Sequence, residues 1–150
     1  MQACLMRKPA KAIAATRVQY GALPFRTGGR SGVEVLLVTS RVTRRWIIPK
    51  GWPLKRKPPH VTAAREAREE AGVVGKVEKR SIGSYSYTKR LKTGAPVLCE
   101  VHVFPLEVTR QRKTWPEQDE RSVQWLSRTK AARTVKDPVL GRLIRDFQRR

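Results

Sequence analysis

Acidic residues are scarce in this chain of 150 residues: 12 Asp and Glu stand against 33 Lys and Arg, so the formal net charge is +21 at pH 7. A charge of this size indicates attraction to polyanions such as nucleotides, polyphosphates, inositol phosphates or RNA. A basic surface that serves only solubility is the plainer alternative. Because the positive charges are spread along the chain, they do not say which polyanion is bound.

Cysteine and long hydrophobic runs are also lacking. The two cysteines, Cys4 and Cys99, lie far apart and belong to no CxxC motif or histidine-containing metal motif. A zinc site and a disulfide framework are therefore not predicted, and reduced, intracellular thiols are expected. No segment is long enough to span a membrane, and the basic N-terminus lacks the continuous apolar stretch of a signal peptide. We expect a cytoplasmic protein without membrane association.

The length predicts one domain, which we place at residues 17–150 after a flexible N-terminal extension at residues 1–16. An organellar presequence is the alternative interpretation of that extension. Strands are expected at 18–24, 34–39, 46–48, 77–89, 96–108 and 123–126. Helices are expected at 60–71, after Ser127, and from Asp137 to about residue 148, with a turn at 72–75 and a polar loop at 110–118. These elements predict an α/β (α+β) fold, a mixed sheet sandwiched between helices.

Three of the twelve acidic residues fall within five positions, at Glu66, Glu69 and Glu70. The spacing i, i+3, i+4 places them on one face of a helix, which we expect to be exposed, while neighbouring alanines pack the opposite side against a sheet. Pro58-Pro59 before the cluster and Gly72 after it are typical of a helix start and a helix end. Carboxylates crowded in this way indicate a divalent metal ion. A solvated helix face with ordinary ion pairs is the alternative.

The segment from Gly51 to Val73 resembles the signature of the Nudix hydrolases. That signature is Gly, five residues, Glu, seven residues, then Arg-Glu-aliphatic-x-Glu-Glu-x-Gly-aliphatic. All 23 positions fit its spacing without a gap. Two residues depart from the pattern: Lys57 stands in place of the first Glu, and Ala67 is smaller than the usual aliphatic residue. Lys57 leaves the number of bound metal ions open.

The resemblance implies an α/β/α Nudix fold and a hydrolase that cleaves P–O–P bonds with Mg²⁺ (or Mn²⁺). The implied metal ligands are Glu66, Glu69, Glu70 and the backbone carbonyl of Lys50. Either Glu66 or Glu70 is the implied base, and Arg65 orients the carboxylates through charge-assisted hydrogen bonds. Gly51 and Gly72 are conformational positions.

The segment from Arg45 to Pro53 resembles the branch of the family that acts on diphosphoinositol polyphosphates and dinucleoside polyphosphates, although Trp52 replaces a glycine there. Trp52 is interpreted as stacking on a base, shielding the site or packing structurally. The residues considered for substrate binding are Arg26, Arg41, Arg44, Arg45, Lys50, Trp52, Lys89 and Glu117. Glu117, with Asp119 and Glu120, is also a candidate base or further metal ligand, and a solvated acidic loop is the alternative.

Two other functions fit the same sequence. The charge of +21 is compatible with a pyrophosphohydrolase that acts on the 5′ end of RNA, or with a catalytically weak Nudix-fold module that binds RNA. The retained acidic cluster favours the enzyme, because uncompensated carboxylates destabilise a fold. The oligomeric state and the physiological substrate are left open.

Overall fold

The computed structural model describes residues 16–30 and 32–149. The expectations for Cys4 and for residues 1–15 of the N-terminal extension lie outside the described residues. The described elements are β1 (Arg17–Gly29), β2 (Gly32–Thr39), β3 (Trp46–Ile47), β4 (Lys50–Gly51), α1 (Pro59–Ala71), β5 (Val73–Val77), β6 (Gly83–Arg90), β7 (Pro96–Gln111), β8 (Val123–Ser127), α2 (Arg128–Thr134) and α3 (Pro138–Asp146).

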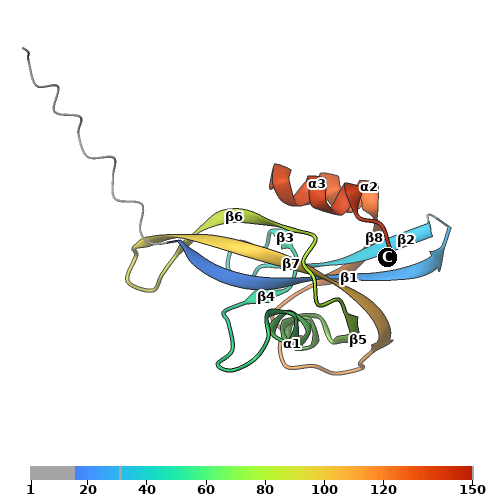
Figure 1. Cartoon of the computed structure of the whole chain (residues 1–150), viewed down its shortest axis with the longest axis horizontal. Helices are drawn as coiled ribbons and strands as arrows, with labels where there is room; N and C mark the ends of the chain where they lie inside the picture. Colours follow the sequence, from blue (N-terminus) through green and yellow to red (C-terminus); the bar gives the residue numbers. More distant parts are fainter. Residues whose placement is uncertain (1–15, 31, 150) are drawn as a thin grey trace, which may run out of the picture.

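The strands form one eight-stranded sheet with the order β3-β2-β1-β7-β5, in which β4 pairs with β1, β6 with β7 and β8 with β2. The β1–β7 pair is parallel and the other pairs are antiparallel. Helix α1 covers one face of the sheet, and α2 and α3 cover the other (Figure 1). The predicted mixed sheet between helices is therefore confirmed.

The long strand β1 changes its partner along one edge. Its C-terminal half pairs with β2 from Phe25 onward, and its N-terminal half pairs with β4 through Tyr20 and Gly21. The Ala22 amide between these two stretches donates to the Pro49 carbonyl oxygen at 2.9 Å. This switch holds β4 against β1, next to the helix that carries the acidic cluster.

Each face of the sheet has its own apolar core. On the α1 side, Ala63, Ala67 and Ala71 are fully buried, so the helix backbone approaches the sheet closely, as predicted. On the other side, α3 buries Leu140, Ile144 and Phe147, and Leu143 packs against them partly exposed. No helix in residues 16–30 and 32–149 has the length and apolar character needed to cross a membrane.

The strand expected at 18–24 extends to Gly29 as β1, where its end pairs with β2. Three further predicted element bounds are wrong. The turn expected at 72–75 is confined to Gly72, whose φ of 69° reverses the chain, and Val73–Val77 then pairs with β7 as strand β5. Strand β7 continues to Gln111, so the polar loop begins later than expected. The strand expected at 77–89 is divided between β5 and β6, which begins at Gly83. Pairing with β7, which local sequence does not reveal, decides all three.

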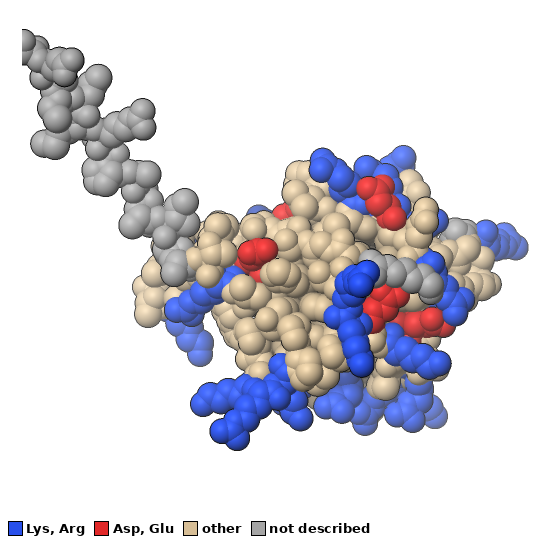
Figure 2. All heavy atoms as spheres, in the orientation of Figure 1, with Lys and Arg blue, Asp and Glu red and all other residues tan. Residues whose placement is uncertain are grey.

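The surface is dominated by positive charge. Figure 2 shows Lys and Arg side chains around the rim of one face and only a few Asp and Glu among them. Acidic side chains are therefore few on this face.

Candidate active site

Helix α1 begins and ends as its sequence dictates. Pro59 occupies the first turn, where the missing N–H is harmless, and the C-cap Gly72 takes a left-handed conformation. A Cβ on Gly72 would meet the Trp115 ring at 2.3 Å, so a second reason for glycine is the close approach of Trp115. These two ends fix the rotation of the helix and hence the direction of its carboxylates.

Glu66 lies against Gly51, as the signature spacing requires. A Cβ on Gly51 would approach Glu66 Oε1 to 2.3 Å, so only glycine admits the carboxylate here. Burial, followed by repulsion from Glu69 and Glu117, raises the pKa of Glu66 to about 7. A carboxyl group with this pKa exchanges protons near neutral pH, which suits a general base.

Glu70 is buried, with 4% of its surface exposed, so the expectation that the whole cluster lies on an exposed helix face is wrong for this residue. Its Oε2 accepts the Lys50 backbone N–H at 3.3 Å, and its Oε1 accepts from Arg121 Nη2 at 3.3 Å. Burial raises the pKa of Glu70, and the positive charge of Arg121 opposes that rise. The helix rotation that buries the alanines also brings the Glu70 carboxylate into contact with β4 at Lys50.

Glu69 faces outward and is held by Arg65 at 2.8 Å, an i,i+4 ion pair on the surface of α1. This ion pair fits both interpretations of the cluster. It is an ordinary surface pair of a solvated helix face, and it also holds Glu69 next to Glu66 and Glu70, as the orienting role of Arg65 requires.

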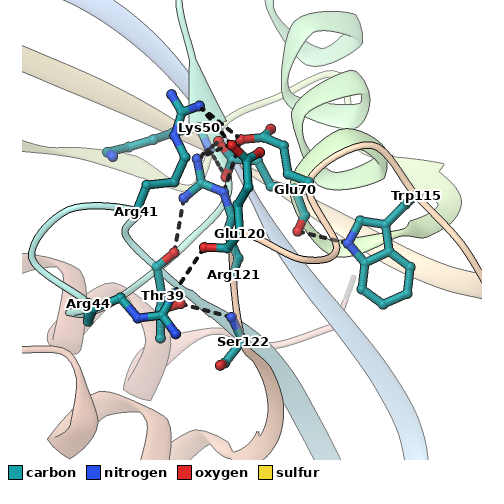
Figure 3. Close-up of polar contacts among 10 residues, drawn as sticks. Thr39, Arg41, Arg44, Lys50, Glu70, Trp115, Glu120, Arg121 and Ser122 are labelled. Carbon is teal, nitrogen blue, oxygen red and sulfur yellow. Dashed lines mark hydrogen bonds and ion pairs between the residues drawn. The ribbon is translucent and has the colours of Figure 1, made fainter.

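Arg121 is the central residue of the site that sequence reasoning missed. Its guanidinium, only 7% exposed, donates to Glu70 Oε1, to Glu117 Oε1 at 3.1 Å and to the Thr39 carbonyl oxygen at 3.0 Å (Figure 3). It therefore joins α1, the end of β2 and the acidic loop. The available signal was an arginine four residues after Glu117 in an acid-poor chain.

The last residue of β7 and the segment that follows it cap the end of α1. The Glu117 N–H donates to the Glu69 carbonyl oxygen at 3.0 Å, and Trp115 Nε1 donates to the Glu70 carbonyl oxygen at 3.2 Å. Gln111 Nε2 donates to the carbonyl oxygens of Ala71 and Gly72. These bonds satisfy carbonyl groups that a helix end leaves without partners, and they deliver the Glu117 carboxylate to the cluster.

The arginine candidates occupy different places. Arg41 approaches Glu117 at 3.7 Å and Glu120 at 3.9 Å, and Arg44 Nη1 donates to the Glu120 carbonyl oxygen at 3.0 Å, so both lie beside the acidic loop. Arg26 instead pairs with Glu34 at 2.9 Å and lies 4.2 Å from the Trp125 ring centre, on the hairpin of β1 and β2. Arg45 is exposed near the start of β3.

Lys50 belongs to β4, and Trp52 follows this strand, with its ring centre 5.3 Å from Lys89 Nζ. Lys50 Nζ is 4.6 Å from the centre of the Tyr87 ring, and burial lowers the pKa of Lys50. Trp52 is 37% exposed. Lys57 lies in the exposed loop before α1, where its N–H donates to the Leu54 carbonyl oxygen.

The donor chemistry of the site fits a hard divalent cation. Besides burial, repulsion from Glu69 and Glu117 contributes to the raised pKa of Glu66, and repulsion from Glu66 and Glu117 contributes to the raised pKa of Glu70. Clustered carboxylate oxygens are the ligands that hard divalent cations take. Across the part of the chain that the structure describes, no three His, Cys, Asp or Glu side chains already enclose a metal position. Arg65 and Arg121 instead balance the carboxylates, so a metal ion would share them with these two side chains.

Two surface hollows lie away from the carboxylates. One, of about 370 Å³, is lined by residues 110–114, and the other, of about 470 Å³, lies between Ile82 and the end of α3. Neither is lined by a carboxylate of the cluster.

The α/β/α fold and its carboxylate-bearing helix are typical of one class of proteins, the Nudix hydrolases. The chain belongs to the Nudix family, because the NUDIX domain model matches residues 15–147. Nudix hydrolase 21, chloroplastic, of Arabidopsis thaliana is 34% identical over 119 residues, covering 77% of this chain and 58% of that protein. Diphosphoinositol polyphosphate phosphohydrolase 3-alpha of Mus musculus is 38% identical over 85 residues, covering 56% of this chain and 48% of that protein.

Solved structures agree with this fold. An Ap4A hydrolase of C. elegans has a TM-score of 0.61 at 18% identity and covers 87% of this chain and 94% of its own. The NUDIX domain of Shewanella oneidensis NrtR, complexed with ADP ribose, has a TM-score of 0.63 at 18% identity, with 94% and 93% coverage. The chain spans 58% and 56% of the first two curated relatives that it matches.

Proposed function

We propose that this chain is a metal-dependent pyrophosphohydrolase that cleaves a P–O–P bond in nucleoside-diphosphate-linked or other polyphosphorylated substrates. The observation that carries the proposal is the arrangement of three carboxylates: Glu66 lies against Gly51, Glu70 accepts from the Lys50 N–H, and Arg121 bridges Glu70 and Glu117. Membership of the Nudix family supports it. A diphosphoinositol polyphosphate or a dinucleoside polyphosphate is the favoured substrate, and the names of two relatives agree with that choice.

The proposed roles follow the positions of the side chains. Glu66, Glu69, Glu70 and the backbone carbonyl of Lys50 would hold Mg²⁺ or Mn²⁺, which when bound neutralises phosphate charge and acidifies water. Glu66 or Glu70 accepts the proton of the attacking water, since both pKa values are raised towards or beyond neutrality. Arg65 holds Glu69, and Arg121 holds Glu70 and Glu117, so the carboxylates are oriented before substrate arrives.

Hydrolysis of a substrate panel tests the proposal. The panel contains dinucleoside polyphosphates, ADP-ribose, nucleoside triphosphates, a diphosphoinositol polyphosphate and 5′-triphosphate RNA, each with Mg²⁺, with Mn²⁺ and with chelator. We expect turnover of at least one class that chelator abolishes. Glu70→Gln should lower kcat by about a hundredfold or more, whereas Glu34→Gln, at a carboxylate paired with Arg26, should leave it unchanged. Full turnover by Glu70→Gln contradicts the assignment.

The net charge of +21 favours a second candidate. The chain would then act on the 5′ end of RNA, or bind RNA as a catalytically weak module in which Lys57 marks the lost acidic position. RNA binding that persists in chelator, together with no turnover of any substrate, would select the module. Cytoplasmic location stays a prediction, and the first two relatives carry the words chloroplastic and mitochondrial in their names.

A further inference from the structure

Three cations gather on two aromatic rings beside the candidate active site. Lys89 Nζ lies 5.3 Å and Arg17 Cζ 5.9 Å from the centre of the Trp52 ring. Lys50 Nζ lies 4.6 Å from the centre of the Tyr87 ring. We call these five residues the Trp52 cluster: Arg17, Lys50, Trp52, Tyr87 and Lys89.

The sheet register brings the cluster together from three strands or their ends, β1, β4 and β6. Arg17 pairs with Cys99 of β7, and Cys99 pairs on its other side with Tyr87 of β6. Tyr87 and Lys89 are two residues apart on β6, so their side chains point to the same face. The Tyr87 hydroxyl donates to Gln19 Oε1 at 2.6 Å, which fixes the ring across β7.

Arg17 and Lys89 form no ion pair within residues 16–30 and 32–149, whereas Arg26, Arg41, Arg65, Arg121 and Arg149 all reach carboxylates there. Lys50 forms no direct ion pair there either, although the Glu70 carboxylate attracts its charge. Three positive charges held close together repel one another. An arrangement of this kind is stabilised by an anion that contacts several of the cations at once.

The cluster is continuous with the carboxylate site. Lys50 and Trp52 flank Gly51, which lies against Glu66, and the Lys50 N–H donates to Glu70. A substrate whose P–O–P bond lies at the carboxylates therefore extends past Gly51 onto the cluster. Aromatic rings favour the nearby cations by about 0.5–1 kcal/mol at exposed sites and restrict their motion, so Trp52 supports the cations and does not need to stack on a base.

We propose that the Trp52 cluster binds phosphate groups that lie outside the cleaved P–O–P linkage, and that it selects substrates carrying such additional phosphates. The inference rests on the proposed function for its substrate, since it concerns the same site. It assigns Trp52 the role of a positioning residue for Lys89 and Arg17. Arg26 is not part of the proposed phosphate site, because the Glu34 carboxylate already neutralises its charge.

Binding of inorganic tripolyphosphate in the presence of chelator tests the cluster without requiring turnover. By calorimetry, we expect Lys89→Gln and Arg17→Gln each to weaken binding about three- to fivefold, the range of a single exposed charge contact. Arg90→Gln, at the end of β6, and Lys92→Gln, in the β6–β7 turn, remove the same charge nearby and should change the affinity less than twofold. Trp52→Leu should match the cation variants, and Trp52→Phe should retain most of the affinity. Equal losses in cluster and control variants would overturn the proposal.

Kinetics on the whole protein give the second measurement. For a substrate with additional phosphates, Lys89→Gln should raise KM with kcat preserved, and for ADP-ribose, which has none, KM should stay within about twofold. If Trp52→Leu impairs ADP-ribose alone, the ring stacks on the base and the proposal is wrong. Tripolyphosphate binding through the cluster without hydrolysis of any substrate would overturn the proposed function and leave the anion site standing. Thermal unfolding of each variant verifies that the fold is intact.

Discussion

At the scale of single residues, Arg121 contributes most to the order of the site. It is one buried cation with three acceptors on α1, β2 and the acidic loop. A guanidinium can serve three acceptors in a fixed plane, and an ammonium cannot do so from one position. Loss of a buried cation also leaves the two carboxylates without compensation.

We therefore predict that Arg121→Gln lowers the free energy of unfolding in chelator by about 3 kcal/mol, the size expected for a broken buried pair. Saturating Mn²⁺ should restore part of that loss, because a bound cation supplies the missing charge to Glu70 and Glu117. Urea unfolding with and without Mn²⁺ measures both effects. Arg149→Gln is the control, since its exposed pair with Glu107 is worth less than about 1 kcal/mol. If Mn²⁺ does not reduce the loss of unfolding free energy in Arg121→Gln, the bound cation does not share Glu70 and Glu117 with Arg121.

Glu66 predicts a pH dependence of stability in the metal-free protein. Its pKa is about 7 in the folded chain and 4.5 in the unfolded chain. Between these values the folded state binds more protons, so the contribution of Glu66 is fully present below pH 4.5 and decreases as pH rises towards 7. The stability difference between wild type and Glu66→Gln should fall across this window in chelator and stay level above it. Urea unfolding from pH 4.5 to 8 measures it, and a constant difference would show that the pKa is not raised.

At the scale of elements, α1 depends on contacts that its own sequence does not contain. Its start at Pro59 and its stop at Gly72 follow local rules, and the observed helix differs from the predicted one by a single residue at its start. The same rules predicted the N-caps of α2 and α3, where Ser127 and Asp137 accept backbone N–H groups. The last carbonyl groups of α1, however, are satisfied by Gln111 at the end of β7 and by Trp115 in the segment that follows, which local sequence indicates only as polar.

Replacement of Gly72 separates the local requirement from the tertiary one. Gly72→Ala adds left-handed strain of about 1–2 kcal/mol and a clash of its Cβ with the Trp115 ring at 2.3 Å, worth a further 1–3 kcal/mol or so. Gly94→Ala carries the same kind of strain, at φ 85°, with no atom within 4 Å of the new Cβ. Thermal or urea unfolding should show a clearly larger loss for Gly72→Ala. Equal losses would mean that Trp115 moves aside without cost.

At the scale of the whole molecule, we expect the net charge to attract polyanions. The formal charge of the full sequence is +21, and Figure 2 shows many Lys and Arg side chains on one face, so RNA should be attracted at long range without regard to sequence. The described acidic residues are concentrated in a few ion pairs and in the candidate active site, which reduces the positive potential there. Long-range attraction and specific substrate contacts are therefore separable by salt.

We predict that the affinity for single-stranded RNA falls linearly on a double-logarithmic plot against salt, with a slope of about −0.7 for each phosphate neutralised. The measurement is a fluorescence titration in chelator from 50 to 300 mM salt. Over this range the Debye length falls from about 14 Å to about 6 Å. Lys89→Gln should reduce the slope by less than one unit, because this charge is one among many. Affinity that is independent of salt would exclude a role for the net charge.

What the sequence alone determined is local chemistry. The i, i+3, i+4 carboxylates, the proline start and the glycine stop depend on neighbours within a turn or two, so their pattern is legible from residues 51–73. Burial of Glu70, its contact with Arg121 across 51 positions of sequence, and the gathering of Arg17, Lys50 and Lys89 were decided only by the tertiary structure. The physical reason is that sheet register and helix packing set distances between residues far apart in the chain, and those distances decide which charges share a site.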